Sequence, residues 1–352
     1  MTTKYNNVFI EDAYTVCGNY ENDGPLSKYF DKKHKKDLYF GEKSWEKAEV
    51  HLLKEANENI LKKNKLKEQD IDLLISGDLQ NQIAASDYMA RDFDIPFLGI
   101  FEACATSSEG LIIGSNFIEG KLCKRILVST SSHNMVSEKQ FRNPTEYGTP
   151  KPKTATFTAT GAVSILLTNK KNKIKIESST IGKVVDMGTT DVNHMGAVMA
   201  PAAGDVIYNH LTATKRDTSY YDLILTGDLG VYGKEILKDY MLTKYNIELG
   251  DNYNDCGTML YDIERQPVFA GGSGPVCSGL VNFGYIYKEM LKGKFKRVLI
   301  VPTGAIFSPT FTFQKESIPA IANCVSLEVV EWWLMFMPFY FAALSVCWLS
   351  LF

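Results

Sequence analysis

The sequence lacks the features of several common protein classes. Its 352 residues carry a net charge of −3 and no basic stripe, so nucleic-acid binding is not expected; the one dense basic cluster, Lys32–Lys36, fits a solvated loop. Seven cysteines are scattered without a CxxC pair, so the sequence predicts no metal site, and it indicates no cofactor. The amino terminus has no apolar run of the kind that a secretory signal needs.

The carboxyl terminus differs from the rest of the chain. Residues 332–352 form a run of 21 residues without a charge, which as a helix would span about 30 Å. The two tryptophans at its start suit a membrane interface, and Pro338 is tolerated in a membrane helix but awkward in a soluble one. A membrane-seeking tail, a buried terminal segment and a non-native extension all fit this run.

An internal repeat organises the remaining sequence. Residues 72–79 (DLLISGDL) return as residues 222–229 (DLILTGDL), and residues 124–128 (KRILV) return as residues 296–300 (KRVLI). Apolar strand-like runs alternate with helix-like segments in both copies, which predicts parallel βαβ units and an α/β fold.

The repeat also sets the expected domain organisation. We predict an amino-terminal half at residues 1–170, a carboxyl-terminal half at residues 171–328 and the apolar tail at residues 329–352. The predicted strands are Asn7–Val16, Leu73–Ser76, Pro96–Phe101, Arg125–Thr130 and Ala162–Thr168 in the first copy, with Leu223–Thr226, Pro267–Ala270 and Arg297–Val301 in the second. The apolar stripe from Trp45 to Ile60 predicts a helix that Ser44 caps.

Polar residues follow the predicted strands at the edge where ligands of parallel sheets gather. Cys104 stands at a strand-to-helix turn, where free amides and the helix dipole favour a thiolate that could attack a thioester. The alternative is a small buried residue at a tight turn. Asp78 is either a site residue or a turn residue that caps the next helix; its repeat Asp228 has the same setting, which favours the structural role.

A duplicated βαβαβαββ unit with a cysteine at the start of its third helix resembles the thiolase and ketoacyl-synthase superfamily. The resemblance implies a layered αβαβα arrangement and, for catalysis, a histidine paired with histidine or asparagine from the second copy. In thiolases one such histidine lies in a Gly-His-Pro stretch, whereas here Gly274 precedes Pro275. None of the five histidines falls in that turn; they are His34, His51, His133, His194 and His210. We therefore predict the fold without catalytic residues, with an acyltransferase that uses Cys104 as the alternative.

A narrower resemblance extends over about residues 5–328. The strings Ala103-Cys-Ala-Thr-Ser107, Thr130-Ser-Ser-His-Asn134, Gln140-Phe-Arg-Asn-Pro-Thr-Glu-Tyr-Gly148 and Lys315-Glu-Ser-Ile-Pro319 together resemble the stage V sporulation protein AD family of spore-forming bacteria. The resemblance implies a thiolase-like protein without established enzyme activity. It implies binding of pyridine-2,6-dicarboxylic acid (dipicolinic acid), free or as the calcium chelate.

The same resemblance implies the partners and the location. Family members work beside membrane proteins that move dipicolinic acid into the developing spore and out at germination. We therefore expect a peripheral protein of the spore inner membrane, with residues 332–352 as a candidate anchor. Because thiolase-fold enzymes are commonly dimers, a homodimer is expected by analogy.

The predicted ligand-binding residues are Asp78, Cys104, His133, Arg142 and Lys153. A planar dianion needs cations and hydrogen-bond donors around a narrow slot. Arg142, Lys151 and Lys153 could supply the charge or could belong to a solvated loop. Asp78 could accept from a protonated ligand or hold calcium, and His133 could orient a carboxylate or only close a strand. Structural roles are expected for His194 and His210.

Overall fold

The computed structural model of the protein describes residues 1–141 and 150–330. The predicted ligand-binding residue Arg142 and the apolar run at 332–352 lie outside this part of the chain. Among the described residues, no helix combines the length and the apolar character needed to cross a bilayer.

A continuous sheet path runs through the molecule in the order β5-β4-β6-β8-β2-β9-β16-β13-β10-β11. The strands of the first half are β2 (Phe9–Cys17), β4 (Leu73–Gly77), β5 (Phe97–Gly99), β6 (Arg125–Ser132) and β8 (Gly161–Thr168). Those of the second half are β9 (Ile174–Thr180), β10 (Leu223–Thr226), β11 (Tyr253–Asp255), β13 (Arg297–Val301) and β16 (Cys324–Val329). Short strands complete the set: β1 (Thr2–Lys4), β3 (Lys32–Lys33), β7 (Phe157–Thr158), β12 (Gly272–Ser273), β14 (Thr303–Ala305) and β15 (Ala320–Ala322).

The strand order is the same in both halves when each is read from its outer edge. Strands β5, β4 and β6 are parallel and continue into antiparallel β8 and β2, and strands β11, β10 and β13 continue in the same way into β16 and β9. The repeated sequences lie on equivalent strands, β4 with β10 and β6 with β13. The two halves meet where β2 pairs with β9 through Phe9 and Ile10. The predicted boundary after residue 170 falls between β8 and β9.

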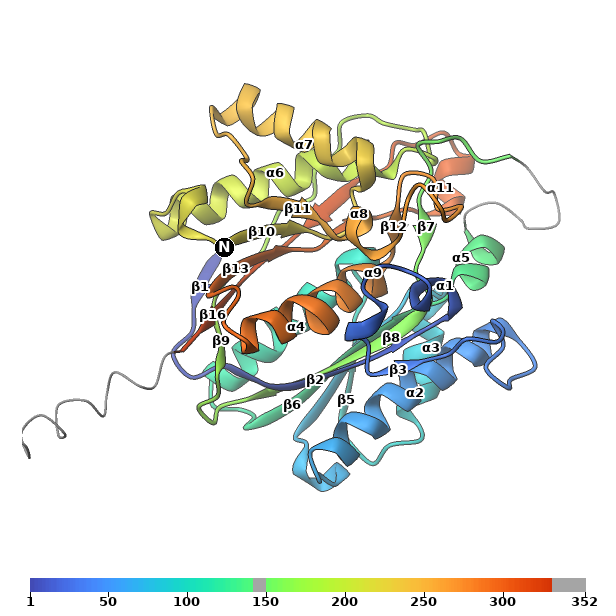
Figure 1. The fold of residues 1–352 in the computed structure, drawn as a ribbon, viewed down its shortest axis with the longest axis vertical. Helices are drawn as coiled ribbons and strands as arrows, with labels where there is room; N and C mark the ends of the chain where they lie inside the picture. The colour runs from blue at the N-terminus through green and yellow to red at the C-terminus, as the bar shows by residue number, and fades with distance from the viewer. Residues whose placement is uncertain (142–149, 331–352) are drawn as a thin grey trace, which may run out of the picture.

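Helices form three layers around the two halves of the sheet (Figure 1). The outer layers hold α2 (Trp45–Lys63) and α3 (Ala84–Ala90) on one side, and α6 (Met195–Thr214) and α7 (Gly230–Tyr245) on the other. Between the sheet halves lie α4 (Thr106–Glu119), α9 (Pro275–Gly279), a π-helical turn (Leu280–Ile286) and α10 (Tyr287–Leu291). Short helices complete the set: α1 (Asn19–Asn22), α5 (Asn134–Gln140), α8 (Cys256–Leu260) and α11 (Pro309–Phe313).

The layered αβαβα arrangement that the superfamily resemblance implied is confirmed. α4 contacts β4 and β6 of its own half and also β16 and α9 of the other, which makes it a shared core element. The predicted cap of α2 is also confirmed, because Ser44 Oγ accepts a hydrogen bond from the Lys47 amide at 3.3 Å.

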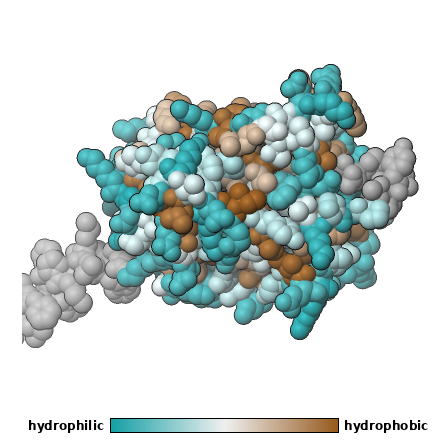
Figure 2. Space-filling view, turned by 90° about the horizontal axis from the view of Figure 1, so that it is seen from above, coloured by the Kyte–Doolittle hydropathy of each residue, from teal (hydrophilic) through white to brown (hydrophobic). Residues whose placement is uncertain are grey.

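The outer surface is mixed in polarity. On the face that Figure 2 shows, apolar side chains gather in small groups with polar side chains between them. Long apolar side chains that are more than half exposed include Leu122, Phe311 and Phe313. Scattered exposed apolar residues of this kind are normal on a folded protein.

One predicted strand is wrong. Pro267–Ala270 forms no strand, and the outer strand of the second half is β11, at Tyr253–Asp255. Two of the three residues of β11 are polar, so the segment has no apolar run that a sequence pattern would detect.

Candidate functional site

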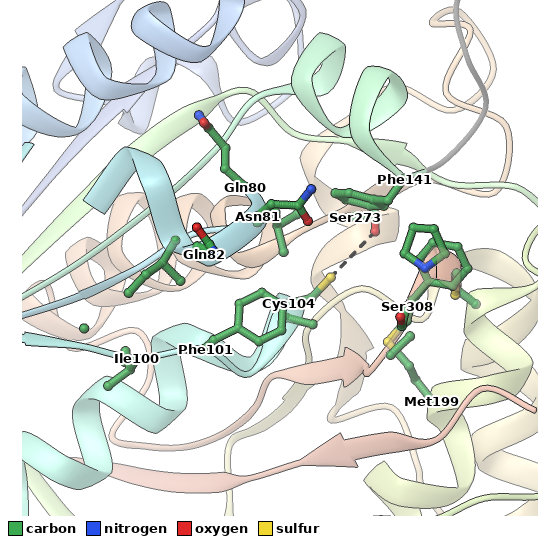
Figure 3. Close-up of a pocket in the computed structure, with 18 residues that line it drawn as sticks. Gln80, Asn81, Gln82, Ile100, Phe101, Cys104, Phe141, Met199, Ser273 and Ser308 are labelled. Carbon is green, nitrogen blue, oxygen red and sulfur yellow. Dashed lines mark hydrogen bonds between the residues drawn. The ribbon is translucent and has the colours of Figure 1, made fainter. Parts of the chain in front are cut away.

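A cavity of about 510 Å³ opens where residues of the two halves meet around Cys104 (Figure 3). Its wall is mostly apolar. The lining comes from the loop Leu79–Ile83, the turn that holds Phe101 and Cys104, Phe141 at the end of α5, Met195 and Met199 on α6, Ser273 before α9, and Phe307–Pro309 after β14. Its volume lies within the range of about 300–1,000 Å³ typical of small-molecule sites.

Cys104 lies in the wall of this cavity, in a 3-10 turn (Ala103–Ala105) that leads into α4. The preceding residue, Ala103, has a left-handed backbone with φ +49°. The side chain is half-buried, and its Sγ lies 4.0 Å from Ser273 Oγ of the second half (Figure 3). Cys104 is therefore at the cavity surface, and the alternative of a fully buried turn residue is wrong.

Asp228 lies behind Cys104, and its carboxylate contacts the turn at Gly274 where the superfamily resemblance implied a histidine. Its carboxylate accepts hydrogen bonds from Thr303 Oγ1 at 2.8 Å, the Gly274 amide at 3.0 Å and Ser273 Oγ at 3.1 Å, and the Cys104 thiol is a further partner. Complete burial raises the pKa of Asp228, and these hydrogen bonds oppose that rise. The second half thus presents the Asp228 carboxylate and the Ser273 hydroxyl to the thiol.

The two repeated aspartates have different hydrogen-bond partners. Asp78 accepts from the amides of Gln80 and Ser86, each at 2.8 Å, and so caps the start of α3 behind the cavity wall. In the second half the amides at the start of α7, Leu229 and Gly230, donate to Asp255 at 2.9 Å. Asp228, which is fully buried, bonds instead to residues 273, 274 and 303. The structural interpretation therefore holds for Asp78, and Asp228 organises a different set of neighbours beside the thiol.

His133 is buried away from the cavity. Its Nε2 donates to the Leu38 carbonyl at 2.8 Å, and its Nδ1 accepts from the Met135 amide at 3.2 Å, which caps α5. Burial lowers the pKa of His133 to about 4, so the ring is neutral near pH 7. These contacts give His133 a structural role and leave it no access to a ligand in the cavity.

The predicted cations also lie apart from the cavity around Cys104. Lys153 is exposed, and Lys151 forms an ion pair with Glu138 beside a small side pocket that shares Phe141 and Phe307 with the main cavity. Within residues 1–141 and 150–330, no lysine or arginine lines the main cavity. Of the predicted ligand-binding residues, the described structure brings only Cys104 to the wall; Arg142 is outside the described residues.

His194 and His210 have the structural roles that we expected. His194 Nδ1 accepts from the Ala197 amide at 3.3 Å at the start of α6. His210 is buried between Thr180 and Tyr221, at 2.8 and 2.7 Å.

Comparison with known proteins identifies the family. A sequence model of the family "Stage V sporulation protein AD (SpoVAD)" matches residues 2–328. The chain belongs to the SpoVAD family. Stage V sporulation protein AD of Bacillus subtilis (strain 168) is 46% identical over 321 residues, which cover 91% of this chain and 94% of that protein. The family resemblance predicted from the sequence strings is confirmed.

Solved structures place the SpoVAD fold among the thiolase-like condensing enzymes. A single-residue variant of OleA from Xanthomonas campestris matches with a TM-score of 0.58 at 10% identity, covering 93% of this chain and 99% of that one. The 3-oxoacyl-[acyl-carrier-protein] synthase III of Aquifex aeolicus VF5 matches with a TM-score of 0.51 at 13% identity, also covering 93% and 99%. At such identities the likeness shows the fold alone.

Proposed function

We propose that this SpoVAD-family protein binds dipicolinic acid and its calcium chelate without catalysing a reaction, and that it supports uptake into the developing spore and release at germination. One observation carries the proposal: the cavity reaches Cys104, and the groups that face the thiol from the second half are Ser273 and Asp228.

The chemistry of these groups argues against condensation. An imidazole that takes the proton of a thiol becomes a cation beside the new thiolate and stabilises it. A carboxylate at the position of Asp228 would instead lie beside a second negative charge, which opposes thiolate formation. Asp228 also holds the Gly274 amide and the hydroxyls of Ser273 and Thr303, so its contacts are those of an organising residue.

The cavity wall suits a flat aromatic ligand. Phe101, Phe141 and Phe307 line it, and the rings of Phe141 and Phe307 lie 6.1 Å apart. Aromatic faces pack well against a planar ring. Ser308 and the carboxamides of Asn81 and Gln82 offer neutral hydrogen-bond donors for carboxylates.

Calorimetry with dipicolinate, in the presence and absence of calcium, tests this proposal. We expect saturable heat, and at least a tenfold weaker affinity for Cys104→Leu, which fills the space beside Ser273. Cys123→Leu is the matched control, because Cys123 is the other half-buried thiol of the described residues and lies away from the cavity. No heat with the wild type, or equal loss in both variants, would contradict the proposal.

The alternative function is an acyltransferase that uses Cys104, and the exposure of its thiol to the cavity favours it. Incubation with acyl-CoA followed by mass spectrometry separates the two. A stable acyl adduct on Cys104 would support the alternative, whereas an unmodified Cys104 that still reacts with iodoacetamide supports a binding role.

We further propose a homodimer that forms through the edge of β5. Within the described residues β5 pairs with β4 alone, and the nearby side chains of Leu98 and Phe101 are 37% and 52% exposed. An unpaired edge with apolar side chains is a natural site for association with a second copy. Light scattering should give a dimer for the wild type and a monomer for Leu98→Glu, with Leu242→Glu on α7 as the control.

The proposed location is the spore inner membrane, beside the membrane proteins of the same transport system, with residues 332–352 as the anchor. Fractionation of sporulating cells tests the anchor. A chain that ends at Glu328 should shift from the membrane to the soluble fraction, and an unchanged distribution would assign the attachment to partner proteins.

A further inference from the structure

The two halves of the molecule differ where the cavity is built. In the second half α7 begins at Gly230, two residues after Asp228, whereas in the first half α3 begins at Ala84, six residues after Asp78. The four additional residues (6 − 2 = 4) are Gln80–Ile83, and all four line the cavity. The first half therefore carries a short wall segment, the loop Gln80–Ile83, that the second half lacks.

This loop has an unusual backbone. Gln82 (φ +61°, ψ +28°) and Ile83 (φ +49°, ψ +42°) are consecutive residues in the left-handed region. That region costs an L-residue free energy, above all a β-branched one such as isoleucine. Strained residues of this kind persist where the surroundings hold them, and they gather at ligand sites.

Three contacts hold the loop in this shape. Gln80 Nε2 donates to Glu49 Oε2 of α2 at 3.0 Å, and the backbone N–H of Asn81 donates to Gln140 Oε1 of α5 at 3.0 Å. Ile83 packs on Gly99 of β5 so closely that a Cβ atom at residue 99 would lie 2.5 Å from Ile83 Cδ1. Anchored at both ends, the loop presents its central side chains in a fixed direction.

The side chains of the loop divide by direction. In Figure 3, Gln80 points away from Cys104 toward its partners on α2, whereas Asn81 lies on the side that faces Cys104 and Ser273. Asn81 is exposed and Gln82 lies beside it in the wall, and within the described part of the chain their carboxamides have no hydrogen-bond partner. Two carboxamides held at a cavity wall by a strained backbone are suited to bind a polar ligand group.

We propose that Asn81 and Gln82 are the specificity-determining residues of the site, and that their carboxamide N–H groups donate to the carboxylate oxygens of the ligand. This inference rests on the proposed binding function and assigns the groups that perform it. A neutral donor pair distinguishes a carboxylate from an amide or an ester of similar shape, because only the carboxylate accepts at both oxygens.

Gln82→Gly tests the proposal because it removes the carboxamide and relieves the backbone. Glycine adopts left-handed φ values freely, so the melting temperature should stay the same or rise, while the affinity for dipicolinate should fall at least tenfold. Lys65→Gly is the matched control: Lys65 is also left-handed (φ +55°) and lies outside the cavity, so its melting temperature should respond alike without a change in affinity. Asn81→Asp keeps the shape, places a charge against the ligand and should also weaken binding at least tenfold.

A second readout separates this inference from the proposed function. With Cys123 and Cys347 replaced by serine, the alkylation rates of Cys104 by iodoacetate and by iodoacetamide are compared. The rate with iodoacetate divided by the rate with iodoacetamide reports carboxylate recognition without dipicolinate. This ratio should fall severalfold in Asn81→Asp and Gln82→Gly. If the wild type binds dipicolinate and the variants bind equally well, the inference is overturned and the proposed function stands. If the wild type binds no dipicolinate, the proposed function fails. A reduced ratio in the two variants would then still support carboxylate binding by the loop, and an unchanged ratio would overturn the inference about the loop.

Discussion

Replacement of Glu49 by glutamine should make the protein more stable at alkaline pH. Glu49 lies on α2, fully buried, where its two carboxylate oxygens accept from Ser131 Oγ and Gln80 Nε2, each at 3.0 Å. Burial, together with the nearby charge of Asp78, raises the pKa of Glu49 to about 8, compared with 4.5 for a free glutamate. The folded protein therefore holds a proton at Glu49 that the unfolded chain releases.

The sign and size of the effect follow from proton linkage. Because the pKa is raised on folding, the stability that the protonated carboxyl gives is complete below pH 4.5 and is lost as the pH rises through about 8. The loss amounts to roughly 1.4 kcal/mol for each pH unit between the two pKa values, and the neighbouring Asp78, whose pKa burial also raises, contributes in the same direction. Glutamine has no proton to lose. Its oxygen can accept from Gln80 while its amide donates to Ser131, so the stability of Glu49→Gln should match that of the wild type near pH 5 and exceed it by an increasing margin toward pH 8.

Urea denaturation of both proteins between pH 5 and pH 8.5 measures this difference. Glu58→Gln is the control, because Glu58 lies on the same helix with a side chain that is 57% exposed, and its profile should parallel that of the wild type. Parallel profiles for Glu49→Gln and the wild type would refute the reasoning, since they would mean that Glu49 titrates alike in the folded and unfolded chains.

Three further substitutions test particular contacts. Gly77→Ala should prevent stable folding or lower the free energy of unfolding by about 3 kcal/mol, because its Cβ would lie 2.2 Å from the Ile100 carbonyl oxygen. Gly250→Ala is the control in thermal melting: the nearest neighbour of its Cβ would lie at 3.8 Å, so the melting temperature should not change. His133→Asn should reduce the loss of stability that the protein shows in acid denaturation between pH 6.5 and pH 4. Burial lowers the pKa of His133 to about 4, so protonation of its ring on acidification destabilises the fold. A stability profile identical to that of the wild type would contradict the lowered pKa of His133. Asp228→Asn should cost about 2 kcal/mol in urea denaturation, because the carboxylate accepts from three groups of the second half, and no loss would show these bonds to be dispensable.

Local patterns in the sequence predicted most of the scaffold. The repeated octapeptides predicted strands β4 and β10, and the spacing from Trp45 to Ile60 predicted α2 together with its cap at Ser44. These features depend on neighbouring residues, so the order of apolar and polar side chains encodes them. The short strand β11 depends instead on its place at the sheet edge, and its residues carry no such signal.

The site was less predictable because hydrogen bonds between distant segments define it. Residues 78 and 228 have the same sequence context, yet Asp78 bonds to amides within its own loop and helix, and Asp228 bonds across to residues 273, 274 and 303. Likewise, no local pattern indicates that Gln82 and Ile83 adopt left-handed conformations. The difference in length between the two Asp-to-helix connections was the available signal, and an alignment of the repeat beyond residue 79 would have detected it.

The division of tasks between Asp228 and Asp255 explains how a duplicated scaffold produces a single asymmetric cavity. Each half needs an acceptor for the free amides that open its outer helix, α3 or α7, and buried amides without one would cost free energy. The first half meets this need with Asp78 at the strand end, which closes that position to any other role. The second half meets it with Asp255 on the neighbouring strand, so Asp228 can turn toward Cys104 and Ser273. Only the first half lengthens the connection between its aspartate and its outer helix, and the added loop Gln80–Ile83 forms the opposite wall of the cavity. On this view the site depends on the divergence of the halves, and an Asp255→Ala substitution should disturb the cavity by drawing Asp228 back to cap α7.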